Sequence, residues 1–103
     1  MSRVRDEDLD RLEARLTQLR TIGQLHERRR GTFTRGAAAF LHFHAFTSGL
    51  AADLNADGRW LRYDVERSTG RRKLLRDVRR ALRGQTGARG RADLKAVRHR
   101  YDR

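Results

Sequence analysis

Two histidines and one aspartate are the residues of this sequence whose types and spacing most resemble a chemical site. His42 and His44 are two positions apart, so they would lie on the same face of a β-strand. Asp53 would reach that face from the next strand if the chain turns back at residues 47–48. Two imidazoles and a carboxylate could hold Zn²⁺ or Fe²⁺ with open positions, as metal hydrolases and oxygenases require. A cross-strand pair between Asp53 and Arg62, flanked by the histidines, explains the same residues without a metal.

A row of arginines later in the chain suggests a second kind of chemistry, the binding of phosphate groups. The positions recur at spacings of four and three, which places them on one side of a helix. Neighbouring like charges destabilise an isolated helix by about 0.2–0.5 kcal/mol per pair, and a bound polyanion would remove that repulsion. A solvated outer face is the alternative interpretation. The predicted nucleic-acid-binding residues are Arg71, Arg72, Lys73, Arg76, Arg79, Arg80, Arg83, Arg89 and Arg91.

Aromatic residues are expected on the same sheet face as the histidines. Phe40, Phe46 and Trp60 fall there in the strand pattern described below. Exposed rings beside arginine can stack unpaired bases. Alternatively these rings are buried, under the C-terminal segment or against a second subunit, because a large apolar patch is unusual on a monomer. They therefore also leave open a homodimer or an acidic protein partner.

Two consecutive β-hairpins over residues 40–65 are predicted to position these side chains. Residues alternate in direction on both sides of residues 47–48 and again around residues 57–58, an Asp-Gly pair that tolerates the positive φ of tight turns. Both turns independently place Leu54 opposite another leucine, so one face of the sheet is apolar. A weaker strand at residues 31–34 would extend this to a three- or four-stranded antiparallel meander.

Helical periodicity flanks the hairpins on both sides. Leucines spaced by three and four over residues 6–20 predict an N-terminal helix, which Gly23 would end. Residues 71–83 predict a C-terminal helix with an apolar arc opposite its arginines, ended by Gly84. Both helices are expected on the apolar face of the sheet. The apolar arc of the second helix consists of Leu74, Leu75, Val78, Ala81 and Leu82.

Composition restricts the class of protein further. The 103 residues suit one domain, and the lack of cysteine excludes disulfides and cysteine zinc sites. No apolar run approaches the ~18 residues of a membrane span, so we expect a soluble, cytoplasmic protein with no membrane contact. The net charge is +12, and residues 66–103 hold fourteen Lys and Arg against four Asp and Glu. Most of the excess positive charge therefore lies in the last part of the chain.

The order of these elements resembles the double-stranded-RNA-binding domain. In that family a helix precedes antiparallel strands, and a last helix opens with a basic cluster that meets phosphates. Here that cluster is Arg71, Arg72, Lys73 and Arg76, and the resemblance covers residues 5–84. The chain departs from the family between the first strands, because it contains no proline for the Gly-Pro of that loop. The resemblance implies a preference for RNA.

A second resemblance rests on short segments. Gly31-Thr32-Phe33-Thr34-Arg35, residues 39–44 and residues 49–53 resemble a family of small bacterial proteins. That likeness implies no function.

These patterns predict an α+β domain over residues 5–84, followed at residues 85–103 by a basic, partly flexible tail with a short helix at residues 92–101. The expected function is non-catalytic binding of nucleic acid through phosphate contacts of the arginine-rich helix and tail, with RNA mildly preferred. No cofactor is expected. Two alternatives remain open: a metal-dependent enzyme at the histidine and aspartate cluster, and a module that binds an acidic protein or a second copy of itself.

Overall fold

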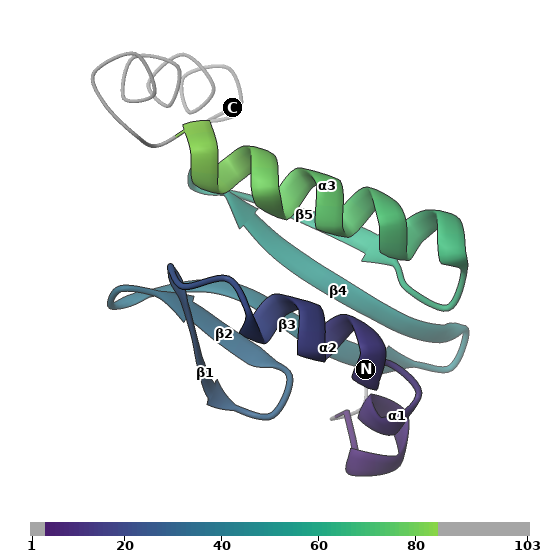
Figure 1. The fold of residues 1–103 in the computed structure, drawn as a ribbon. Coiled ribbons are helices and arrows are strands. Elements are labelled where there is room, and N and C mark those ends of the chain that lie inside the picture. Colours follow the sequence, from purple (N-terminus) through teal and green to yellow (C-terminus); the bar gives the residue numbers. More distant parts are fainter. Residues whose placement is uncertain (1–3, 85–103) are drawn as a thin grey trace.

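The computed structural model describes residues 4–84, which form three helices and one five-stranded antiparallel sheet (Figure 1). The strands lie in the sheet in the order of the sequence, so each pairs with its neighbours along the chain. This confirms the α+β class and the meander. The predicted tail at residues 85–103 lies outside the described residues. The elements are α1 (Asp6–Asp10), α2 (Glu13–Arg20), β1 (Leu25–Arg29), β2 (Thr32–Arg35), β3 (Ala38–Phe46), β4 (Gly49–Ala56), β5 (Arg59–Asp64) and α3 (Ser68–Gly84).

The hairpins β3–β4 and β4–β5 have the predicted register. Leu54 pairs with Leu41 on one side and with Leu61 on the other. Both connections are two-residue loops, and in the second Asp57 and Gly58 have φ angles of 60° and 88°. Positive φ at both positions matches the right-handed twist of the flanking strands. Turn chemistry and hydrophobic alternation therefore agree on one register.

Strand β1 is an addition to the three or four strands that the sequence predicts. Its residues 25–29 include one apolar side chain, Leu25, and the other four are His, Glu and two Arg. β1 is an edge strand that pairs with β2. Charged side chains at a sheet edge discourage pairing with other chains. The charged composition of β1 therefore suits an edge strand. It also leaves no hydrophobic alternation from which the strand could be predicted.

The predicted helix at residues 6–20 is divided in two. Leu12 has φ −110° and ψ 10°, so the chain leaves helical geometry between α1 and α2. The leucines of the predicted apolar stripe are nevertheless buried on both sides of this break. They are Leu9, Leu12, Leu16 and Leu19.

The helices α2 and α3 lie on the same face of the sheet, as predicted, and α3 runs over β4 and β5 (Figure 1). Every residue of the predicted apolar arc of α3 is buried against this face. The helix begins at Ser68 rather than at residue 71, and Gly70 lies in its first turn. A Cβ atom on Gly70 would stand 1.6 Å from the carbonyl oxygen of Asp64, so only glycine allows this approach of α3 to β5.

The prediction that Phe40 lies on the face of the histidines is wrong. Phe33 pairs with Leu41 and Thr34 pairs with Ala39, so Phe40 is an extra residue in β3 with no partner in β2. Such a bulge interrupts the alternation of side chains. Phe40 is 3% exposed and belongs to the buried core. It therefore cannot contribute to a docking surface.

Within residues 4–84, no helix has the length and apolar content needed to cross a membrane.

Candidate nucleic-acid interface

One side of α3 carries four arginines that surround a pocket. Arg72, Arg76, Arg79 and Arg83, here called the arginine flank, line a pocket of about 280 Å³ whose apolar wall is Leu75. Helical spacing alone puts the four on one side, and burial of the opposite arc turns that side outward. From Arg72 to Arg83 the helix rises about 16 Å. That length equals about five base-pair steps of a duplex.

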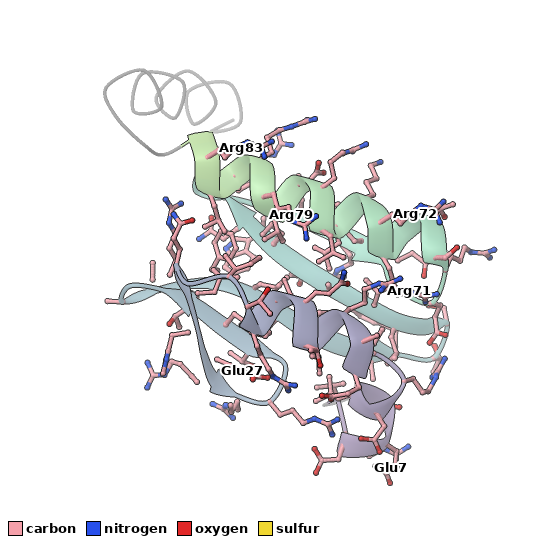
Figure 2. All side chains as sticks on the ribbon, in the orientation of Figure 1. Glu7, Glu27, Arg71, Arg72, Arg79 and Arg83 are labelled. Carbon is pink, nitrogen blue, oxygen red and sulfur yellow. The ribbon has the colours of Figure 1, made fainter. Side chains whose placement is uncertain are left out.

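The cations of α3 have few internal carboxylate partners. Within residues 4–84, no carboxylate oxygen lies at ion-pairing distance from Arg72, Lys73 or Arg79. Arg76 donates to Asp77 Oδ1 at 3.1 Å, and Asp77 is the single acidic residue in the sequence of α3. Figure 2 shows the labelled Arg72, Arg79 and Arg83 spread along the helix. Arg72, Lys73 and Arg79 are therefore exposed cations with no carboxylate partner among residues 4–84.

The carboxylate of Asp77 contacts Tyr63 of β5 as well as Arg76 of α3. The hydroxyl of Tyr63 donates to Asp77 Oδ2 at 2.7 Å and thereby ties α3 to β5. Burial of Asp77 would raise its pKa, but the hydrogen bonds from Tyr63 and Arg76 outweigh burial, and the pKa is lowered. Burial and this same bond raise the pKa of Tyr63. Asp77 is therefore ionised near neutral pH.

Arg71 differs from the other predicted binding residues. Its Nη1 donates to the carbonyl oxygens of Val65 and Glu66, at 2.9 and 2.8 Å. Arg71 also lines a pocket of about 260 Å³ where α2 meets the start of α3, together with Arg11 and Glu66. Glu66 accepts hydrogen bonds there from Arg11 and from the backbone N–H of Leu50. Arg71 thus holds the connection between β5 and α3.

The remaining predicted residues divide into two groups. Lys73 and Arg80 are exposed on α3 but do not line the pocket of the arginine flank. Arg89 and Arg91 lie outside the described residues. Leu75 is the pocket residue that the sequence analysis missed, because the helical wheel assigned it to the core. Its position at the border of the apolar arc is the signal that could have identified it.

Several charged residues of α1, α2 and residues 27–30 form ion pairs with one another. Arg30 donates to Asp10 at 2.8 Å and to Glu13 at 2.9 Å, and Arg20 donates to Glu13 at 2.7 Å and to Glu27 at 2.6 Å. Arg30, followed by Arg20, lowers the pKa of Glu13, and Arg20 lowers the pKa of Glu27. We call this set the paired cluster. It comprises Asp6, Asp10, Glu13, Arg20, Glu27 and Arg30.

The predicted cross-strand pair at Asp53 is confirmed. Arg62 donates from Nε to Asp53 Oδ1 at 2.8 Å and from Nη2 to Oδ2 at 2.9 Å. His44 Nε2 also lies 2.9 Å from Asp53 Oδ2, but it makes no directed hydrogen bond there, so this is a charge contact when the imidazole is protonated. Arg62 is the main cause of the lowered pKa of Asp53. Burial, followed by the charge of His44, lowers the pKa of His42.

These contacts weigh against the metal alternative. Both carboxylate oxygens of Asp53 are held by the guanidinium of Arg62. Among residues 4–84, no three His, Cys, Asp or Glu side chains are grouped so that they could hold a metal ion. The His42, His44 and Asp53 cluster thus has the geometry of a cross-strand ion pair beside two rings.

Comparisons with models of protein families, with curated proteins and with solved structures found no match for this chain.

Proposed function

We propose that the protein binds nucleic acid without catalysis, through phosphate contacts of the arginine flank and of the basic residues that follow α3. The observation that supports this most directly is the pocket formed by four arginines on one side of a helix whose only acidic residue is Asp77. Guanidinium groups bind phosphate bidentately, and contacts to phosphate carry no sequence information. RNA would be mildly preferred over DNA, on the element order shared with the double-stranded-RNA-binding domain. The proposed location is the cytoplasm.

The test is the salt dependence of binding by the variant Arg76→Gln/Arg79→Gln. Each phosphate neutralised contributes about 0.9 to the slope of log K against log salt on duplex DNA, and about 0.7 on single strands. Removing two contacts should therefore make the slope shallower by about 1.8 on a duplex and about 1.4 on a single strand. Fluorescence anisotropy with labelled RNA and DNA probes over a salt series measures this change.

The matched control is Arg20→Gln/Arg30→Gln, which removes the same charge from the paired cluster. A general effect of net charge would change both double variants equally, whereas phosphate contacts on α3 predict a change in the α3 variant alone. If the α3 variant binds every probe as tightly as the wild type at every salt concentration, the arginine flank is only a solvated surface.

A further inference from the structure

A row of rings crosses the face of the sheet opposite α2 and α3. The ring of Trp60 lies 5.3 Å from that of His42, His42 lies 4.8 Å from His44, and His44 lies 6.1 Å from Phe46, measured between ring centres. Arg62 places its guanidinium carbon 4.7 Å from the centre of the Phe46 ring. We call Trp60, His42, His44 and Phe46 the aromatic row. It belongs to β3 and β5 and lies outside the hydrophobic core.

The aromatic row is accessible at both ends, to solvent at Trp60 and to a pocket at Phe46. Trp60 is 47% exposed and is the one large hydrophobic residue in that state within residues 4–84. At the other end, Phe46 and Arg62 line a pocket of about 570 Å³ together with Arg67. Small-molecule sites occupy about 300–1,000 Å³, so this pocket has room for a nucleotide. Arg62 and Arg67 pair with Asp53 and Asp64, but both arginine side chains remain more than half exposed.

We propose that the aromatic row binds the bases of single-stranded nucleic acid by stacking. Rings and arginine planes on a sheet are the groups on which unpaired bases stack, because every base has a π-face. The proposal rests on nucleic acid being the ligand of the protein, but it uses residues other than those of α3, on the opposite face of the sheet. The arginine flank would then supply phosphate contacts to any nucleic acid, and the aromatic row would supply selectivity for single strands.

A second copy of the chain fits this face less well. A stable interface buries about 800 Å² per partner around an apolar centre. Here Asp53 and Arg62 lie beside the rings, so the centre of the face is polar. Each copy also carries a net charge of +12, which repels another copy and attracts a polyanion.

The single tryptophan of the chain provides the test. Fluorescence of Trp60 should be quenched when the wild-type protein is titrated at low salt with a short oligouridylate. A blunt RNA duplex of the same length and heparin, a polyanion without bases, should bind without comparable quenching. Equal quenching by heparin would overturn the proposal, because charge alone would then explain the signal.

Substitution of single rings measures how much each ring contributes to the affinity for oligouridylate. Stacking of one base on one ring contributes enough that Trp60→Ala or Phe46→Ala should weaken oligouridylate binding about five-fold or more, with the duplex affected less. Trp60→Phe should restore most of the affinity, and Thr47→Ala, in the exposed turn beside Phe46, is the control. Circular dichroism melting curves establish that each variant is folded. Equal affinities of Trp60→Ala and wild type for oligouridylate would contradict the stacking role.

The outcomes separate this proposal from the proposal for α3. If anisotropy reports binding but Trp60 is not quenched, the aromatic row is not a site and the α3 proposal stands. If Trp60 is quenched and the salt slope is unchanged in Arg76→Gln/Arg79→Gln, the α3 proposal fails and the aromatic row stands. If sedimentation shows a dimer that Trp60→Ala dissociates, the occupant is a second copy and the stacking proposal is overturned.

Discussion

Arginines of the paired cluster and of the arginine flank differ in the counter-charges that surround them. Arg20 contacts Glu13 of α2 and Glu27 of β1, and Arg30 contacts three carboxylates of α1 and α2. Arg72 and Arg79, by contrast, have no carboxylate at ion-pairing distance within residues 4–84. In Figure 2, Glu27 of the paired cluster lies away from the labelled Arg72, Arg79 and Arg83 on α3. The difference shows that arginine content alone does not identify a binding surface. What distinguishes Arg20 and Arg30 from Arg72 and Arg79 is that the fold places carboxylates beside the first two and none, among residues 4–84, beside the other two.

The largest expected effect comes from separating α3 from the sheet. Gly70→Ala would place a Cβ atom 1.6 Å from the Asp64 carbonyl oxygen, so α3 could not keep its present position. We expect a loss of stability of about 3 kcal/mol or more, measured by urea denaturation. Gly23→Ala is the control, because nothing lies within 4 Å of a Cβ atom there. If Gly70→Ala had the same urea denaturation midpoint as the wild type, α3 would be able to move away from β5 at little cost in stability.

The next effect separates stability from binding. Arg20→Gln/Arg30→Gln removes the centres of the paired cluster and should lower the melting temperature, because Glu13 and Glu27 lose their hydrogen-bond donors. Nucleic-acid affinity should stay within about two-fold, since Arg20 and Arg30 already have carboxylate partners, lie outside α3, and exposed charges are screened by salt. Arg76→Gln/Arg79→Gln should show the reverse pattern, with weaker binding and an unchanged or higher melting temperature. If both double variants changed nucleic-acid affinity and melting temperature to the same extent, the proposed difference between the paired cluster and the arginine flank would be wrong.

Acid should weaken the paired cluster. The hydrogen bonds from Arg20 hold the pKa of Glu27 below its ordinary value of 4.5. A lowered folded-state pKa means that the stabilisation is fully present above the unfolded-state pKa and is lost as pH falls through the folded-state pKa. Glu27→Gln should therefore reduce the loss of stability that occurs as pH falls below 4.5. Urea midpoints at several pH values measure it, and identical pH profiles for variant and wild type would argue against the pairing.

The smallest expected effect concerns the acid on α3. Asp77→Asn removes the carboxylate beside Arg76 while an amide oxygen can still accept the hydrogen bond from Tyr63. Affinity for nucleic acid at low salt should rise by roughly two-fold, in line with the small contribution of an exposed ion pair. Anisotropy titrations of the two proteins in parallel detect this change. Weaker binding by Asp77→Asn in a folded protein would show that Asp77 orients Arg76 for its ligand.

The sequence predicts those parts of the fold that have a strong local signal. The Asp57-Gly58 turn and the position of Leu54 determine the register, and the wheel of α3 correctly separates its buried and exposed sides. Strand β1 is missed because it has a single apolar residue. Phe40 is misplaced because a bulge inserts one residue without any change in composition.

The candidate site is predictable to a similar extent. Helical spacing is a local property, so the arginine flank follows from the sequence of α3 alone. The paired cluster depends on contacts between Arg30 and residues 17 to 24 positions earlier, which only the fold brings together. The aromatic row follows from the predicted strand register, apart from Phe40, which the bulge in β3 removes from that face. Sequence reasoning alone could therefore not tell a counter-charged arginine from one that is available to a ligand.

The order of the strands in the sheet also has a consequence for the speed of folding. Each strand pairs with its neighbour in sequence, so the ladders close through short loops and the entropy of loop closure is small. The chain contains no proline, so prolyl isomerisation cannot add a slow phase. We therefore expect the meander to form rapidly around β3 and β4. Attachment of α3 at Gly70 would come later, because it needs the end of β5 already in place.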